Sequence, residues 1–126
     1  MRFLNSAMAR AIHSDLIQRY GGSYGVRDSG LLESALARSQ QLANYEPDAT
    51  IAHLAAVLGW GLLKNHAFVD GNKRIGIAAM ITFLKLNGHQ LTCSEVEETA
   101  MVLRAAASEL TEAEWTTWVE RVVAPL

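Results

Sequence analysis

The sequence predicts an all-α fold: one compact domain of about six helices around a buried central helix. Three observations support it. Apolar residues recur at spacings of three and four, no long run alternates apolar and polar residues, and β-branched residues are sparse. The 126 residues, half of them apolar, suffice for one core and include no linker or repeat, so we assign residues 1–126 to a single domain.

Glycine, proline and capping residues delimit the first three helices. The first runs from about residue 5 to 20 and ends at two glycines, which adopt a left-handed C-cap at little steric cost. The second is capped at position 28 or 29 and is interrupted by Pro47. The third is capped at position 48 or 50 and ends near residue 65. Between the first two, residues 21–30 form a glycine-rich surface loop.

The fourth helix, over about residues 71–86, is apolar nearly all round after Arg74. We therefore expect it to be the central helix, with small residues that permit close packing. It ends at Asn87-Gly88. The fifth and sixth helices begin at residues 94–97 and 111–114, where the same capping-box pattern occurs twice.

Bulk properties exclude several classes of protein. The net charge of −2 does not suggest a broad nucleic-acid-binding face. A single cysteine, Cys93, rules out an internal disulfide and fits a reducing compartment. The N-terminus lacks a signal-peptide core, and no apolar run approaches the roughly 20 residues that span a bilayer. We expect a cytoplasmic protein that binds neither membranes nor nucleic acid directly.

Residues 66–74, which precede the fourth helix, carry the candidate chemistry. The unpaired N–H groups and the positive dipole end of a helix form an anion site, and Gly71 lets the backbone approach a ligand closely. Lys73 and Arg74 add positive charge where the helix dipole prefers acids. Such a local conflict often marks function, and a bound polyphosphate would remove it.

Two further side chains complete a set suited to phosphoryl or nucleotidyl transfer. Asp70 offers a hard oxygen ligand of the kind that Mg²⁺ with a nucleotide requires. His66 is a base that can be neutral near pH 7. Phe68, between them, is expected to anchor the loop in the core.

The same segment resembles the signature of the Fic/Doc superfamily, H-x-F-x-[DE]-G-N-[GK]-R. Residues 13–38 and 83–88 resemble its death-on-curing (Doc) branch, and the likeness extends over about residues 4–105. In the Fic branch, glycine stands where this chain has Lys73, and a second arginine stands where it has Ile77. Both differences favour Doc.

The resemblance implies a toxin that transfers phosphate from ATP to a hydroxyl of a translation factor of the elongation factor Tu type. It further implies that the nucleotide lies reversed relative to Fic enzymes. By the same resemblance His66 would be the general base and Asp70 would hold Mg²⁺. Four consecutive residues would bind the phosphates: Gly71, Asn72, Lys73 and Arg74. The loop over residues 23–27 would help to dock the target.

Each of these residues also has an ordinary structural role. Taken singly, His66 would be a helix cap or surface residue and Asp70 an N-cap. Asn72 would satisfy backbone groups of the turn, while Lys73 and Arg74 would form a solvated helix start. His13, on the first helix, is expected to make a buried structural hydrogen bond.

The fifth helix bears on regulation. We interpret Glu95, Glu97 and Glu98 as a solvated face at the start of this helix. Residues 94–99 only half match the inhibitory S/T-x-x-x-E-G/N helix of Fic proteins, and the arginine that it engages is absent. We therefore expect control by a separate Phd-like antitoxin.

Three other functions remain open at this point. The same loop would serve a Fic-type protein adenylyltransferase, which transfers AMP. A non-enzymatic binding module of the same fold is a further alternative, although it predicts a broken loop and this loop is intact. A DNA-binding helical protein fits less well, because no basic recognition helix is present.

Overall fold

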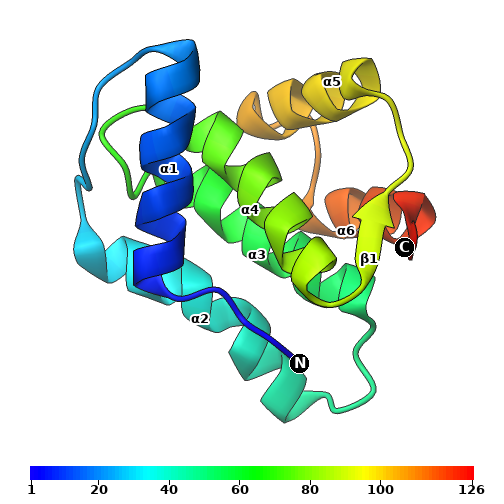
Figure 1. Ribbon diagram of the computed structural model, residues 1–126. Coiled ribbons are helices and arrows are strands. Elements are labelled where there is room, and N and C mark those ends of the chain that lie inside the picture. Colours follow the sequence, from blue (N-terminus) through cyan, green and yellow to red (C-terminus); the bar gives the residue numbers. More distant parts are fainter.

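The computed structural model describes residues 1–126 and contains six helices and two short strands (Figure 1). The elements are α1 Ser6–Tyr20, α2 Ser29–Tyr45, α3 Ile51–Asn65, α4 Asn72–Leu86, β1 His89–Leu91, α5 Glu95–Ala106, α6 Glu112–Val122 and β2 Val123–Pro125. All six predicted helices are present. No helix combines the length and apolar character that a membrane span needs.

The helix starts show which capping residues the chain uses. Asp28 caps α2 and Thr50 caps α3, each by accepting a backbone N–H bond. At α6, Thr111 and Glu114 form the predicted reciprocal capping box. Only half of the capping box predicted at α5 is formed. Ser94 accepts from the N–H of Glu97, but the Glu97 carboxylate accepts a bond from Trp118 Nε1 at 2.8 Å instead of reaching back.

The strands β1 and β2 were not predicted. They pair antiparallel, with Gln90 opposite Ala124, and join the end of α4 to the end of the chain. The N–H of Leu126 donates to the carbonyl of Gly88, and the N–H of Arg2 donates to the side chain of Asn87. Both chain ends are thereby attached to the turn that follows α4.

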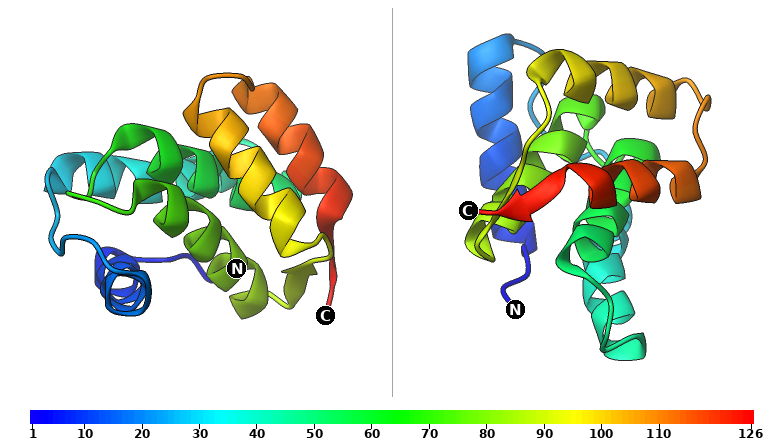
Figure 2. Two further views of the ribbon diagram at one scale, coloured as in Figure 1. Left: turned by 90° about the horizontal axis from the view of Figure 1, so that it is seen from above. Right: turned by 90° about the vertical axis from the view of Figure 1, so that its right-hand side faces the viewer.

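The core is built on the pair α3 and α4, which run side by side through the middle of the molecule (Figures 1 and 2). Their backbones approach closely at two glycines, since a Cβ on Gly76 would lie only 3.1 Å from the carbonyl oxygen of Gly59. The prediction that α4 is a central helix is confirmed, but α3 shares the centre and is the more buried of the two. The longest buried run, residues 54–59, belongs to α3, whereas Ile77 and Ile81 of α4 are half-buried.

The remaining helices flank this pair. Figure 2 shows α1 on one side of α4 and the α5–α6 pair on the other. Trp115 and Trp118 of α6 are buried as expected, and Trp115 Nε1 donates to the carbonyl of Ala56 at 3.1 Å. On α3, Lys64 donates to the carbonyl of Ala105 at 2.9 Å. The N-terminus of α4 is therefore held between α1 and α5.

Candidate active site

The loop from His66 to Gly71 lies between two left-handed residues. His66 ends α3 with φ 52° and ψ 44°, and Gly71 begins α4 with φ 74° and ψ 20°. A non-glycine residue in this conformation costs about 1–3 kcal/mol and tends to occur at functional sites. The alternative that Asp70 is the N-cap of α4 is wrong: Gly71 is the N-cap. Asp70 Oδ1 accepts a bond from the N–H of Gly71 at 2.8 Å.

Asn72 closes the loop upon itself. Its side-chain oxygen accepts from the N–H of Phe68 at 3.1 Å, and its side-chain nitrogen donates to the Phe68 carbonyl at 3.0 Å. The Phe68 ring is 1% exposed, which confirms its predicted role as an anchor. Both polar atoms of the Asn72 side chain are thus bonded within the loop and stabilise its shape. The backbone N–H of Asn72 is the group of this residue that can bind a ligand.

The glycine-rich segment after α1 supports the loop from outside. Val26 forms an isolated antiparallel bridge with Phe68, and the N–H of Val69 donates to the carbonyl of Gly25 at 3.0 Å. Arg27 Nε donates to the carbonyl of His66 at 2.8 Å. This last bond stabilises the strained backbone at His66, while the His66 side chain is left exposed and without a protein partner.

His13 supports the loop from inside. It is 2% exposed, its ring stacks on Phe68 with centroids 3.9 Å apart, and its Nε2 donates to the carbonyl of Asp70 at 2.7 Å. This confirms the buried hydrogen bond expected for His13. Because a peptide unit is planar and trans, pointing the Asp70 carbonyl toward α1 points the N–H of Gly71 the opposite way.

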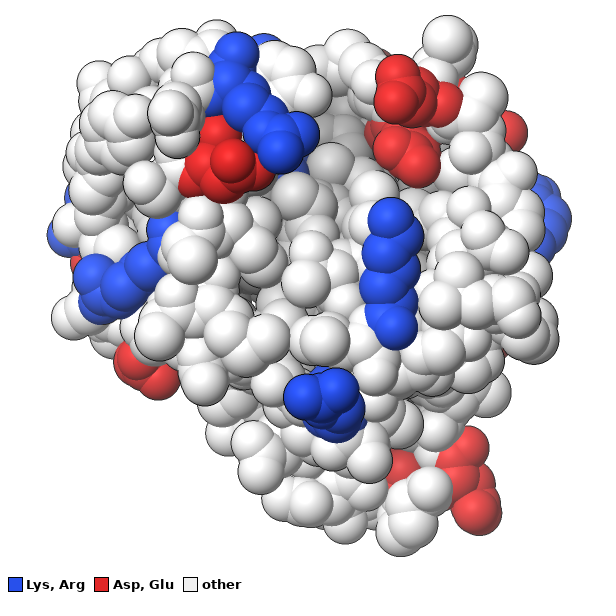
Figure 3. Space-filling view, in the orientation of Figure 1, with Lys and Arg blue, Asp and Glu red and all other residues white.

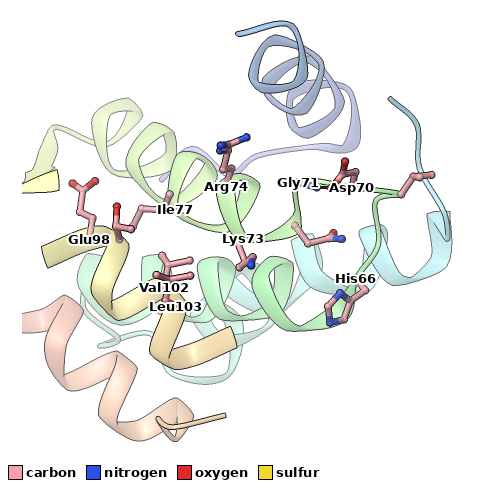
Figure 4. Close-up of a pocket in the computed structure, with 12 residues that line it drawn as sticks. His66, Asp70, Gly71, Lys73, Arg74, Ile77, Glu98, Val102 and Leu103 are labelled. Carbon is pink, nitrogen blue, oxygen red and sulfur yellow. Dashed lines mark hydrogen bonds between the residues drawn. The ribbon is translucent and has the colours of Figure 1, made fainter. Parts of the chain in front are cut away.

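The first turn of α4 has the open donors of an anion site. Its first backbone bond runs from the N–H of Ile75 to the carbonyl of Gly71, so the N–H groups of residues 72–74 have no intrahelical acceptor. The side chains of Lys73 and Arg74 leave the helix in different directions (Figure 4). The Arg74 guanidinium lies over the ring of Tyr20 at 4.5 Å, a cation–π contact that holds it near α1.

A cavity of about 750 Å³ opens over this turn, between α4 and α5. Its size is typical of small-molecule sites. The six predicted site residues all line it, namely His66, Asp70, Gly71, Asn72, Lys73 and Arg74. Figure 3 shows charges of both signs scattered over this side of the molecule, with no continuous basic surface. The cavity therefore favours a small anionic ligand over a nucleic acid.

The wall of the cavity contributed by α5 was missed in the sequence. Glu98, Thr99, Val102 and Leu103 line it, and Ile77 of α4 faces them (Figure 4). The prediction that Glu98 belongs to a solvated face is wrong, because its side chain is half-buried. Burial and the nearby charge of Glu95 raise the pKa of the Glu98 carboxyl. No local sequence pattern could have revealed this, since it depends on how α5 packs.

The site fits a magnesium–nucleotide complex better than a metal held by protein alone. No group of three His, Cys, Asp or Glu side chains comes together to bind a metal. Asp70 is the one carboxylate in the loop, and its Oδ2 accepts only a long bond, 3.2 Å, from the N–H of Ser23. Mg²⁺ in nucleotide sites is commonly held by one or two carboxylates plus phosphate oxygens and water. Asp70 can supply that carboxylate.

A helical domain with this loop, held between α1 and α5, has the architecture of the Fic/Doc family. The Fic/DOC family model matches residues 3–84, so the chain belongs to this family. Toxin Doc of Mycolicibacterium smegmatis is 50% identical over 74 residues, 57% of this chain and 56% of that protein. Protein kinase doc of Escherichia phage P1 is 31% identical over 110 residues, 87% of this chain and 86% of that protein.

The two matches differ in extent. The match to the mycobacterial toxin spans a little over half of that protein's length, whereas the match to the phage kinase spans most of both chains. The names of both relatives belong to the Doc branch, in agreement with the two residues, Lys73 and Ile77, that favoured it.

Proposed function

We propose that this chain is a Doc-type protein kinase and the toxin of a toxin–antitoxin pair. It transfers the γ-phosphoryl group of ATP to a hydroxyl of a translation factor of the elongation factor Tu type, and so arrests translation. The observation that carries the proposal is the cavity over the first turn of α4, where open N–H groups lie with Lys73, Asp70 and His66.

Each group in the cavity has a separate proposed role in the reaction. The open N–H groups of residues 72–74 and the Lys73 ammonium bind phosphate oxygens. His66 accepts the proton of the attacking hydroxyl. A bond forms between the hydroxyl oxygen and the γ-phosphorus as the bond to the β-phosphate oxygen breaks, and ADP leaves. Asp70 would hold magnesium with the nucleotide, and the ion would supply positive charge to neutralise the phosphates.

Two residues support phosphoryl over adenylyl transfer. Ile77 lines the cavity on the turn after Arg74 and offers no charge for a terminal phosphate bound in the Fic direction. Lys73 instead adds a cation at the helix start, next to the site of reaction. A Phd-like antitoxin in the cytoplasm would then control the enzyme, because the arginine that the inhibitory helix of Fic proteins engages is absent from this chain.

The test labels ATP in one of two places. The purified chain is incubated with Mg²⁺, an elongation factor Tu and ATP labelled on either the γ- or the α-phosphate. We expect γ-label on the factor. Label from the α-phosphate would show adenylyl transfer instead, and no label from either would leave only a binding module.

Substitution of the proposed base provides the second arm. His66→Ala should abolish labelling and the growth arrest that expression of the chain causes. The control is His53→Gln, because His53 is half-buried on the first turn of α3, about 20 Å along the helix from His66. Unimpaired transfer by His66→Ala would refute the assignment of the base.

A further inference from the structure

Glu98 is the one α5 carboxylate that lines the cavity. It is half-buried, and the structure gives its side chain neither a hydrogen bond nor an ion pair. Its neighbour Glu97 is engaged by Trp118, and Glu95 is exposed. Its oxygens reach solvent and have no protein partner, so they are free to accept hydrogen bonds from a ligand. Burial and the nearby charge of Glu95 raise the pKa of this carboxyl.

The cavity changes character from one end to the other. His66, Lys73 and the open N–H groups lie toward the end of α3, whereas Glu98 lies at the far end along α4 (Figure 4). Beside Glu98, the wall is mostly apolar: Ile77, Val102 and Leu103 line it, with the polar Thr99 next to Glu98. A carboxylate repels phosphate and an apolar wall does not solvate it, so the polyphosphate belongs at the cationic end.

The end of the cavity near Glu98 suits a portion of the ligand that has an apolar face and hydrogen-bond donors. A nucleoside has both, because its base presents flat apolar faces and its ribose carries two hydroxyl groups. Carboxylates that accept bonds from ribose hydroxyls are a recurrent solution in nucleotide-binding sites. The two ends of the cavity thus favour one orientation of a nucleotide, with its phosphates toward Lys73 and its nucleoside toward Glu98.

We propose that Glu98 is a specificity-determining residue that accepts hydrogen bonds from the ribose hydroxyls of the nucleotide, whose base lies against Ile77, Val102 and Leu103. This inference rests on the proposed function, since it concerns the nucleotide that the enzyme uses. It assigns the enzyme a preference for ribonucleotides over deoxyribonucleotides, set from α5 and not from the signature loop.

The test compares four ligands by isothermal titration calorimetry in the presence of Mg²⁺: ATP, 2′-deoxy-ATP, 3′-deoxy-ATP and inorganic triphosphate. The proteins are the full chain, Glu98→Gln and the control Glu95→Gln. The control removes the same charge one turn earlier, from an exposed side chain that does not line the cavity. Thermal melting of all three proteins verifies that they are folded.

We expect the unmodified chain to bind ATP about tenfold more tightly than at least one deoxy analogue, as loss of a hydrogen bond to a charged group predicts. Glu98→Gln keeps only an uncharged amide oxygen as acceptor, so it should weaken ATP binding toward the level of that analogue and should distinguish the two less strongly. Its affinity for triphosphate should not fall. Glu95→Gln should match the unmodified chain with every ligand.

Three results would overturn the inference. The first is unchanged ATP affinity in Glu98→Gln, and the second is a variant that discriminates between ATP and both analogues as strongly as the unmodified chain. The third is an equal loss of triphosphate affinity, which would show that the substitution disturbs the phosphate end of the cavity and not a contact with the ribose. In each case the unmodified chain still binds ATP and the proposed function stands, whereas failure of that chain to bind ATP or triphosphate would remove both proposals.

Discussion

Gly22 provides a sharp test of the role of Asp70. A Cβ at Gly22 would lie 2.7 Å from Asp70 Oδ2, closer than real Cβ contacts come, and 3.1 Å from Ile17 Cδ1, which is tighter than most. In Gly22→Ala the carboxylate must therefore turn away, and it loses the bond from the N–H of Ser23. We expect the position in which Asp70 is proposed to hold magnesium to be lost with it.

Gly21→Ala is the matched control. Gly21 also has a positive φ, +84° against +115° for Gly22, but a Cβ there meets nothing within 4 Å. Both variants should lose about 1–3 kcal/mol of unfolding free energy from backbone strain. Gly22→Ala should lose about 1 kcal/mol more, for the broken hydrogen bond and the crowding.

The assay combines thermal melting with initial rates of phosphoryl transfer at several Mg²⁺ concentrations. Gly21→Ala should melt earlier and still react well at temperatures where it is folded. Gly22→Ala should show a kcat/KM at least about tenfold lower, equivalent to 1.4 kcal/mol of transition-state stabilisation, and a higher requirement for Mg²⁺. Equal activity and equal Mg²⁺ dependence in the two folded variants would refute the reasoning.

Three further outcomes can be measured. His13→Phe keeps an aromatic ring but removes the donor to the Asp70 carbonyl. We therefore expect a raised KM for ATP in this variant and partial rescue in His13→Gln. Equal kinetics in both variants would contradict this. Asn72→Ala opens two loop hydrogen bonds and should lower the unfolding free energy by about 1–3 kcal/mol as well as the activity, as melting and rate measurements would show. Hydrogen bonds from Thr111 lower the pKa of Glu114, so its carboxylate stabilises the fold at neutral pH and this contribution is lost as pH falls through the lowered pKa. Melting curves of Glu114→Ala and the unmodified chain should therefore differ at pH 7 and converge in acid.

Much of the architecture could be predicted because helix boundaries depend on local chemistry. Caps such as Thr111, and the glycines that follow α1, act within one turn of their own position. Which helix is most buried could not be predicted from α4 alone. Hydrophobic periodicity reports the faces of one helix, whereas burial depends on how many neighbours surround it, and α3 contacts α2, α4, α5 and α6.

The residues of the candidate site could likewise be predicted only in part from the sequence. The signature loop is contiguous, so its residues from His66 to Arg74 could be proposed from their order, and the structure brings them to one cavity. Glu98 could not be identified, because its position depends on the rotation of α5 against α4. The bridge between Val26 and Phe68 and the three-residue strands are likewise pairings of distant segments that have no periodic signal of their own.

The many bonds that hold the loop from residue 66 to residue 72 have a consequence for cooperativity. Its backbone is bonded to residues 25–28, to His13 and to the side chain of Asn72, so its order is inseparable from that of the surrounding helices. The conformational entropy of ordering the loop is lost during folding and not again at each encounter with substrate. The loop should then exchange its bonded amide hydrogens as slowly as the core, and heat should abolish the proposed activity and the global structure in one transition.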